Sequence, residues 1–483
     1  ISISLLIFIV GCSVGPDYVR PPVEMPDSTL YMQDYTVEDS LALALADTTW
    51  WELFGDTVLT YLIKTAVQEN NDIKIAAARV DEFMGLYGVE ESNYYPKLDV
   101  GASGRVGEYN VDGIKFRSER WTLDLSAFWE IDIWGKYRRA NEAALANLLA
   151  AEEVRRGVIL SITSFIASSY FDLLSLDAQL EIAKRTVDSR EKSLNLFQQR
   201  WERGDISQLE ISQLESEYWF AKSQIPFIEK SIVQLENAIS VLLGRSPGPI
   251  PRGKPLNDLL LPEIPESMPS QLLERRPDVL QAEQELISAN ARIGVVKSQY
   301  YPSLSLNGLI GFSNNDISML FDQSSFVWNT GGTLLAPLFR AGEISSQVDA
   351  SEAIQRQAFF NYIKSVQTAF SDAQNALVDR KKTEEIYFAD GKRLDALTTY
   401  FELSHLRYDE GATSYLEVLD AERNLFDSEL GYVQSRATVL KSVVGIFSSI
   451  AGGWLDKTAY ESYQPMNPVE QEEPEQPSET GNE

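Results

Sequence analysis

The sequence predicts an α+β membrane protein in which a few long β-strands join very long α-helices and other copies of the chain complete the fold. Three observations predict this class: an alternating segment at 121–133, an internal repeat of about 206 residues, and two helical runs without proline. Between 121 and 133 every odd position is apolar, and Phe128 alone interrupts the polar even positions. A strand with one apolar face and this length is long enough to span a membrane.

Composition excludes several classes of function. The chain has 483 residues and a formal net charge of −29, which argues against a nucleic-acid partner because phosphate binding requires a basic surface. One cysteine and one histidine cannot form the usual Cys/His zinc site. Gly244–Gly248 fits the pattern G-x-S-x-G, but it follows a predicted helix instead of the strand that a nucleophile elbow requires. We therefore expect no enzyme and no metal.

The N-terminus resembles that of a bacterial lipoprotein. Residues 1–11 form an apolar run that is too short to span a bilayer and is typical of a signal peptide remnant. The run ends Val10-Gly11-Cys12, which resembles a lipobox, and Ser13 gives no signal for retention at the inner membrane. We expect diacylglycerol and palmitate on Cys12, because two or three acyl chains give a stable anchor. The alternative is an apolar terminus with a chance cysteine.

Two halves of the chain repeat one unit. Arg200–Glu215 aligns with Arg407–Glu422, and Asn93–Leu98 aligns with Gln299–Leu304. A repeat must be recognised before a fold is assigned. We place a lipidated N-terminal segment at 12–55, the two units at 56–268 and 269–457, and a disordered acidic tail at 458–483.

Each unit is predicted to contain the same elements in the same order. A helix of about 30 residues leads to Tyr-Tyr-Pro, two strands follow, and two long helices end the unit. A loop rich in charge and glycine is expected between the first two strands. The predicted strands are 98–106, 121–133, 303–312 and 326–336. The predicted long helices are 136–203, 207–243, 343–410 and 414–444. Glycines in the turns and serines as N-caps would separate the long helices: Gly204, Gly411, Ser207 and Ser414.

Four strands in one chain cannot close a barrel, because membrane barrels have at least eight strands and an open edge is not tolerated in lipid. Two chains would give eight strands and too tight a barrel for a channel, whereas three would give twelve strands and leave a lumen. In such a barrel the odd positions of 121–133 would face lipid. Thr122, Asp124 and Ser126 would face the lumen.

Five motifs together resemble the TolC-like outer-membrane efflux family, in its lipoprotein (NodT-type) branch that partners RND-type pumps. They are the Tyr-Tyr-Pro before each strand pair and the segments Val14–Pro22, Ile131–Lys136, Pro337–Gly342 and Arg407–Arg423. The resemblance implies a homotrimer with a twelve-stranded outer-membrane β-barrel, a long periplasmic α-helical barrel and a mixed equatorial belt. It also implies a periplasmic membrane-fusion adaptor, an inner-membrane pump and outer-membrane lipid as partners in a Gram-negative bacterium, with most of the mass in the periplasm.

The resemblance also assigns roles at the predicted helical tips. Glu417 and Asp420 match the carboxylates that line the family's constriction, and in a trimer they would form two acidic rings. Tyr408 would hydrogen-bond Glu210 and hold the tip shut, together with Arg407. Some members carry an arginine where this chain has Thr413, so one latch is missing here. The turns that contact the adaptor would contain Gly204, Ser207, Gly411 and Ser414.

The expected function is passive conduction of small molecules such as drugs from the adaptor and pump to the exterior. Two alternatives share most of these features: a type I protein-secretion duct, and a coiled-coil structural lipoprotein without a pore. The sequence does not predict the substrate, which the pump would choose.

Overall fold

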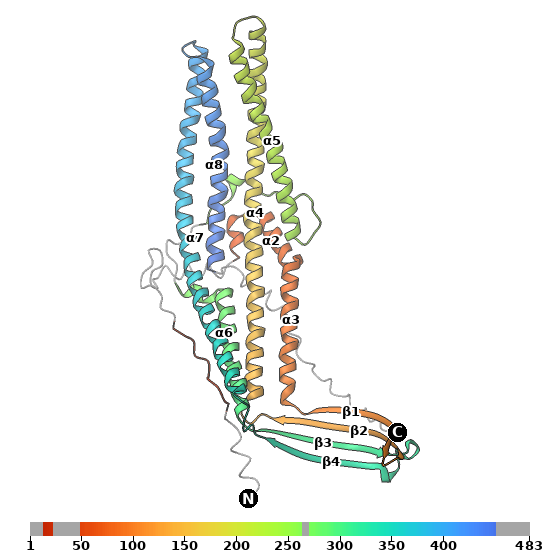
Figure 1. Cartoon of the computed structure of the whole chain (residues 1–483). Coiled ribbons are helices and arrows are strands. Elements are labelled where there is room, and N and C mark those ends of the chain that lie inside the picture. The colour runs from red at the N-terminus through yellow and green to blue at the C-terminus, as the bar shows by residue number, and fades with distance from the viewer. Residues whose placement is uncertain (1–12, 23–48, 263–269, 451–483) are drawn as a thin grey trace, which may run out of the picture.

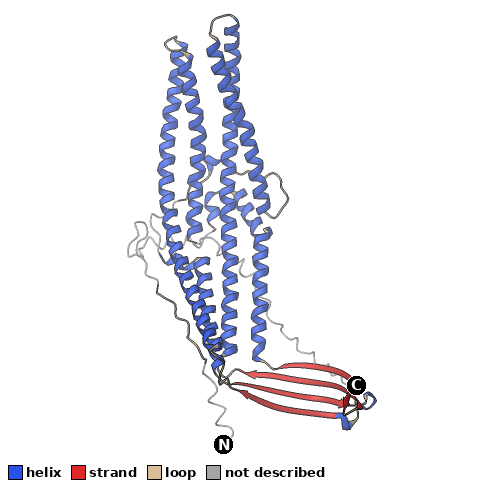
Figure 2. Ribbon diagram, viewed as in Figure 1, coloured by secondary structure: helices blue, strands red, loops and turns tan. Residues whose placement is uncertain are grey.

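The structure is a computed structural model that describes residues 13–22, 49–262 and 270–450. Long helices run side by side along most of its length (Figure 1). Two helical hairpins end at one extremity, and a single β-sheet projects sideways from the opposite end of the helices (Figure 2). Cys12 and the acidic tail lie outside the described residues.

Both halves of the chain contain the same order of elements. The first half consists of α2 (Thr57–Glu69), α3 (Asn71–Glu91), β1 (Lys97–Val111), β2 (Ile114–Ile131), α4 (Lys136–Glu202) and α5 (Gln208–Leu242). The second half consists of α6 (Pro277–Lys297), β3 (Ser303–Asn314), β4 (Phe326–Leu335), α7 (Glu343–Asp409) and α8 (Tyr415–Ser449). The long helices have matching lengths: α4 and α7 each have 67 residues, and α5 and α8 each have 35.

The first predicted helix of about 30 residues is in fact two helices, α2 and α3. Asn70 separates them with an extended backbone (φ −61°, ψ 131°). Its side-chain oxygen accepts hydrogen bonds from the amides of Asp72 and Ile73 at 2.8 and 3.1 Å, so it caps α3. Its side-chain amide donates to the carbonyl of Leu242, the last residue of α5, at 2.8 Å. Asn70 therefore satisfies the start of one helix and the end of another.

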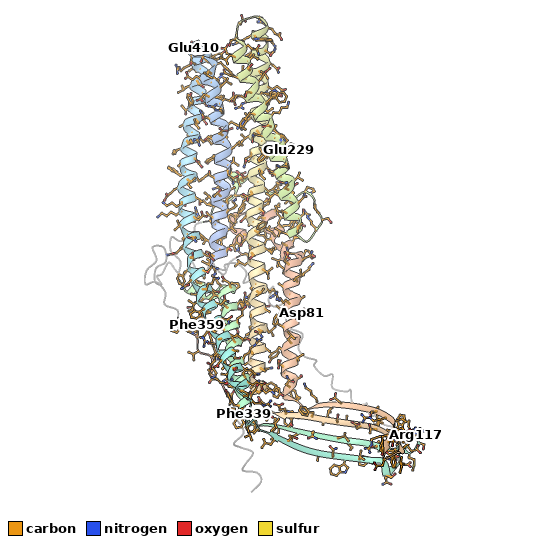
Figure 3. All side chains as sticks on the ribbon, viewed as in Figure 1. Asp81, Arg117, Glu229, Phe339, Phe359 and Glu410 are labelled. Carbon is orange, nitrogen blue, oxygen red and sulfur yellow. The ribbon has the colours of Figure 1, made fainter. Side chains whose placement is uncertain are left out.

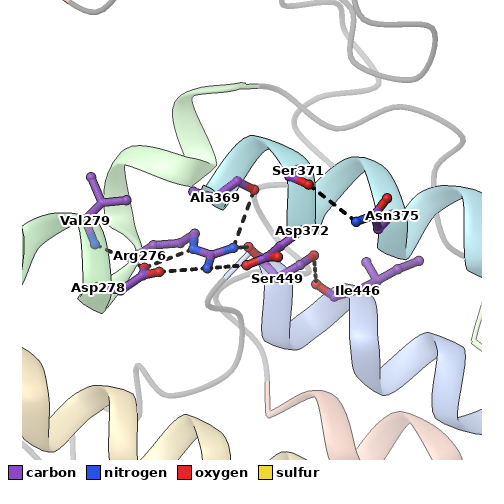
Figure 4. Close-up of polar contacts among 9 residues, drawn as sticks. All are labelled: Arg276, Asp278, Val279, Ala369, Ser371, Asp372, Asn375, Ile446 and Ser449. Atoms are coloured by element: carbon purple, nitrogen blue, oxygen red, sulfur yellow. Dashed lines mark hydrogen bonds and ion pairs between the residues drawn. The ribbon is translucent and has the colours of Figure 1, made fainter. Parts of the chain in front are cut away.

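Arg276 occupies the corresponding position in the second half, because 276 − 70 gives the repeat spacing of 206. The buried guanidinium donates to the carbonyl of Ser449, the last residue of α8, at 3.0 Å. It also pairs with Asp278 at 2.8 Å and with Asp372 of α7 at 2.9 Å (Figure 4). In each half, the carbonyl of the last residue of the final long helix thus accepts a hydrogen bond from the side chain at the equivalent position. In the second half this side chain also brings a positive charge to the negative end of the helix dipole.

The four strands form one antiparallel sheet in the order β1-β2-β3-β4, so β1 and β4 are its edges within the chain. Residues opposite each other in an antiparallel pair share a face. The register therefore extends the alternation of β2 to the part of the sheet in which all four strands are paired. On the face of Leu123 the paired residues are largely apolar: Leu98, Val100, Ala102, Leu125, Leu304, Leu306, Ile310, Phe312, Phe326, Trp328 and Leu334. The other face, with Thr122, Asp124 and Ser126, is mostly polar.

The apolar face of the sheet is not covered by the core of the chain. No residue of β2 or β4 is buried in the structure. Val100, Trp328 and Leu334, which all lie on this face, are each more than 60% exposed. The sheet therefore presents its apolar face to the surroundings, as the expectation of a lipid-facing surface requires.

The prediction of a loop rich in charge and glycine between the first two strands is wrong. β1 and β2 continue as a paired hairpin up to a two-residue turn, Asp112-Gly113, in which both φ angles are positive (52° and 83°). This turn is typical of a tight hairpin, because its twist matches that of the strands. The prediction failed because residues 107–120 lack an apolar face, which was the only strand signal used. β2 also ends at Ile131, two residues before the predicted end.

The main hydrophobic core lies where α4 passes the other helices. It joins η2 (Trp50–Phe54) and α2 to α4, α5 and α8, with Trp50, Phe54 and Phe171 among its largest fully buried side chains. By length and composition α4 contains a segment apolar enough to cross a membrane, but half of that segment is buried inside the chain. Its apolar character is explained by this packing. A second core joins α6, α7 and the end of α8.

The segment 13–22 lies against the point where sheet and helices meet. The amide of Val14 donates to the carbonyl of Trp134 at 2.9 Å. A Cβ added to Gly135 would come within 2.9 Å of the Cα of Ser13, so the glycine permits this close approach. Further along, buried Arg139 pairs with Asp17 at 2.5 Å. The chain immediately after Cys12 is therefore fixed beside the base of the sheet.

Candidate functional site

The two helical tips use the same backbone turn. After α4, the amide of Gly204 donates to the carbonyl of Trp201 at 2.8 Å and that of Asp205 to Arg200 at 2.9 Å. After α7, Gly411 and Ala412 repeat this pattern with Tyr408 and Arg407 at 2.9 and 2.8 Å. This is the Schellman arrangement, in which a residue with positive φ ends the helix. Gly204 and Gly411 supply it at +80° and +71°. Figure 3 labels Glu410 at this extremity.

The helices after the turns begin differently. Ser207 caps α5, because its hydroxyl accepts from the amide of Glu210 at 3.3 Å while the Glu210 carboxylate accepts from the Ser207 amide at 2.8 Å. This reciprocal pair is a capping box. Ser414 occupies the N-cap of α8 but makes no side-chain cap bond. Glu417, the counterpart of Glu210 in the second half, therefore has its carboxylate available for other contacts.

Glu417 and Asp420 lie on one face of α8, as their spacing predicts. Glu417 accepts from Arg407 at 2.7 Å and from the hydroxyl of Thr413. Asp420 accepts from Arg423 at 2.8 Å and from Asn424 at 3.0 Å. Both carboxylates border a groove between the starts of α5 and α8, which is lined by Gln213, Ser216, Glu217, Thr413, Ser414, Leu416, Glu417, Leu419, Asp420 and Arg423.

The expected hydrogen bond between Tyr408 and Glu210 is not formed within the chain. The hydroxyl of Tyr408 accepts from Arg200 of α4 at 2.7 Å, and Glu210 is held in the capping box. The reason is local: the Ser207 amide and hydroxyl both lie within reach of the Glu210 carboxylate. Arg407 contacts Glu417 and not Tyr408. The predicted latch residues are therefore distributed over two separate contacts.

An aromatic cluster surrounds the contact between Arg200 and Tyr408. The ring of Phe197 lies 4.2 Å from that of Tyr415, and Tyr408 lies 5.0 Å from Tyr415, measured between centroids. The Arg200 guanidinium lies 5.2 Å from the Phe197 ring. Because α4 contributes Phe197 and Arg200 while α7 and α8 contribute the tyrosines, this cluster joins the two hairpins. Sequence analysis missed Arg200, although it aligns with Arg407 in the repeat.

Near the aromatic cluster, buried Arg190 and Glu422 and half-buried Glu217 lie together on α4, α8 and α5. Arg190 is 3% exposed and pairs with Glu217 at 3.2 Å. It also donates to the main-chain carbonyl of Glu217 at 2.6 Å. Glu422 is 9% exposed, and burial raises the pKa of its carboxyl above the ordinary range. Arg190 lowers this pKa and Glu217 raises it, but burial is the larger effect. Burial thus shifts Glu422 toward its neutral form relative to an exposed glutamate.

Comparison with known proteins identifies the family. The family model described as "Outer membrane efflux protein" matches residues 62–245 and again residues 268–452. The chain belongs to this family. It is 31% identical over 455 residues to the solvent efflux pump outer membrane protein SrpC of Pseudomonas putida, which covers 93% of this chain and 97% of that protein. It is 31% identical over 448 residues to the cation efflux system protein CusC of Escherichia coli, covering 92% and 96%.

A solved structure of CusC has the same fold as this outer membrane efflux protein. The two superpose with a TM-score of 0.83 at 30% sequence identity, over 92% of this chain and all of the other. The predicted resemblance is confirmed. The fold and the relatives' names are those of efflux channels and not of enzymes. They also favour efflux over a protein-secretion duct or a structural lipoprotein without a pore.

The contact between Arg200 and Tyr408 generates a first prediction. Tyr408→Phe removes the hydroxyl that accepts from half-buried Arg200, and the loss of this hydrogen bond costs about 0.5–1.5 kcal/mol at the joint between the hairpins. We expect ion conductance of the purified protein in planar bilayers to rise several-fold. Arg200→Gln should have the same direction of effect. If Glu210→Gln raised conductance and Tyr408→Phe did not, the contact inferred from the family resemblance would be the correct latch.

Buried Glu422 generates a second prediction. A carboxyl whose pKa is raised on folding stabilises the packed state while it is protonated, and this contribution is lost as pH rises through the raised pKa. Amide hydrogen exchange at the start of α8, corrected for intrinsic rates, should therefore be faster at pH 8 than at pH 5.5. Glu422→Gln, which is always neutral, should weaken this dependence on pH. An unchanged dependence in Glu422→Gln would show that another group is responsible.

Proposed function

We propose that three copies of this chain form one closed twelve-stranded barrel in the outer membrane. The observation that carries the proposal is an open four-stranded sheet with one apolar face and two unpaired edges, β1 and β4. In lipid, unpaired backbone groups along such edges cost several kcal/mol each. Pairing β4 of each copy with β1 of the next satisfies both edges, and three times four strands gives twelve.

The helices support the same assembly. Large apolar side chains are exposed along the outer surfaces of α5 and α7, among them Trp219, Phe227, Phe360 and Phe388, each about 60–70% exposed. Exposed apolar surface of this extent marks an interaction surface. Neighbouring copies packed side by side would cover it and enclose a tunnel that continues the barrel into the periplasm.

In this assembly the protein is the passive exit channel of a tripartite efflux system. A periplasmic adaptor and an inner-membrane pump of the RND type would supply substrate and energy. The turns with Gly204, Ser207, Gly411 and Ser414 are the proposed adaptor contacts, and nothing lies within 4 Å of a Cβ added to either glycine. The relatives' names include both a solvent pump and a cation system, so this channel's fold does not restrict the substrate to one class.

Glu417 and Asp420 are the proposed constriction. Each would occur three times around the axis, so the groove face of α8 would form two acidic rings. Arg407 partly neutralises Glu417, and Arg423 partly neutralises Asp420. The rings would therefore attract cations less strongly than bare carboxylates. Separation of the hairpins at Arg200 and Tyr408 would widen this constriction.

A direct test combines mass with susceptibility. The detergent-solubilised protein should have about three times the chain mass of 54.3 kDa, or about 163 kDa, in light scattering. Deletion of its gene should sensitise the native host to a panel of solvents, drugs and metal cations, and a plasmid copy should restore resistance. A monomeric mass, together with unchanged susceptibility across the panel, would contradict the proposal.

A lipid on Cys12 is proposed because of where the following residues lie. Ser13 and Val14 contact Gly135 and Trp134 beside the base of the sheet. In the proposed barrel this is the periplasmic rim of the membrane, so acyl chains on Cys12 would reach the inner leaflet directly. We expect mass spectrometry of the purified protein to find a diacylglycerol adduct and an added acyl chain on an N-terminal Cys12. A Cys12→Ser variant should carry neither, and an unmodified wild-type protein would contradict the anchor.

A further inference from the structure

The β1–β2 hairpin extends beyond the rest of the sheet. β3 pairs with β2 no further than Trp121, which lies opposite Asn314, and the seven residues 114–120 pair with β1 alone. At about 3.4 Å per residue, this two-stranded extension is about 24 Å long. Figure 3 labels Arg117 at this end of the molecule, far from the helices. In the proposed barrel the extension stands at the outer mouth.

The register assigns each side chain of the extension to a face. Arg105 lies opposite Arg120, and Tyr109 lies opposite Phe116. All four share the face of Thr122 and Asp124, which is the lumen face of the proposed barrel. The rings of Tyr109 and Phe116 stack at a centroid distance of 5.6 Å. The inward face of the extension is therefore basic with an aromatic end.

The charged side chains on the two faces of the extension differ in whether they form ion pairs. On the outward face Lys115 pairs with Glu108 at 2.8 Å and Arg117 pairs with Glu119 at 2.5 Å. On the inward face, the side chains of exposed Arg105 and Arg120 form no ion pair or hydrogen bond within the part of the chain that the structure describes. Like charges directly opposite each other destabilise an antiparallel pair. This pair therefore opposes folding of the hairpin, and an anion between the two guanidinium groups would relieve the repulsion.

The other inward charges lie further down the lumen. Asp124 is four residues from Arg120 along β2, about 13 Å away, and Asp99 lies opposite Ser126. Between these levels the hydroxyls of Ser103 and Thr122 hydrogen-bond each other at 2.8 Å. In the neighbouring β3–β4 loop, Asp316 is occupied with Ser318 at 2.7 and 2.9 Å. Near the base of the sheet Lys97 and Glu130 share this face, so a solute that travels outward would pass them first, then Asp99 and Asp124, and the arginines last.

We infer that Arg105 and Arg120 form an anion-binding ring at the outer mouth of the channel. Two arginines from each of three copies would place six guanidinium groups around the opening. Guanidinium groups bind carboxylates and phosphates in a fork geometry, and a charged ring selects solutes by the sign of their charge. The ring would favour the exit of anionic organic solutes. This inference rests on the proposed function, because only a closed barrel has a mouth.

The test uses two matched double variants of the same hairpin. Arg105→Ser with Arg120→Ser removes two inward positive charges, and Lys115→Ser with Arg117→Ser removes two outward ones. Both are compared with the parent in planar bilayers, in the Tyr408→Phe background so that the tip does not limit the current. The reversal potential in a KCl gradient reports ion selectivity, and citrate added on the outer side reports anion binding through block of the current.

The inward double variant should shift the reversal potential toward cation selectivity and weaken citrate block about tenfold. The outward double variant should change both quantities much less. A third variant, Arg105→Lys with Arg120→Lys, should keep the selectivity and weaken the block, because it keeps charge and loses the fork. Equal effects of the inward and outward variants, or no effect of either, would overturn the ring. Absence of any channel current in the parent would instead contradict the proposed function.

Discussion

The structure depends on one constraint: the backbone groups at the two edges of a four-stranded sheet must find partners. The four-stranded part of the sheet is apolar on one face, so it belongs in lipid, where water cannot satisfy the backbone groups at the edges of β1 and β4. Closure with other copies fixes the symmetry of everything attached to the sheet. The long helices begin directly after β2 and β4, and so they inherit the same rotational arrangement.

In the helical part, the internal repeat places related side chains at equivalent positions of the two halves. Asn70 and Arg276 satisfy the last carbonyls of α5 and α8 from equivalent positions, one as a neutral amide and the other as a buried charge with two carboxylates. At the tips the same divergence recurs. Glu210 caps its helix, whereas Glu417 contacts Arg407 and Thr413. One copy of each pair keeps a structural contact and the other acquires additional charged partners.

Much of the fold could be predicted because its signals are periodic. The alternation in 121–133, the absence of proline in α4 and α7 and the repeated turns gave the element order and most boundaries to within a few residues. The outer hairpin could not be found in this way, because strands outside lipid need no apolar face. The partner of Tyr408 was also missed. The Ser207 amide and hydroxyl occupy the Glu210 carboxylate, and Arg200 occupies the Tyr408 hydroxyl. Only the packed geometry decides which of these hydrogen bonds form.

The equal lengths of the paired helices restrict which insertions and deletions this chain can accept during evolution. α4 and α7 match at 67 residues, and α5 and α8 match at 35, so the two hairpins are equally long. One inserted residue advances a helix by 1.5 Å and rotates everything beyond it by about 100°. An insertion or deletion in one half would therefore leave an uneven rim and misalign the apolar stripes. Viable changes of length should come in multiples of seven residues and in both halves together.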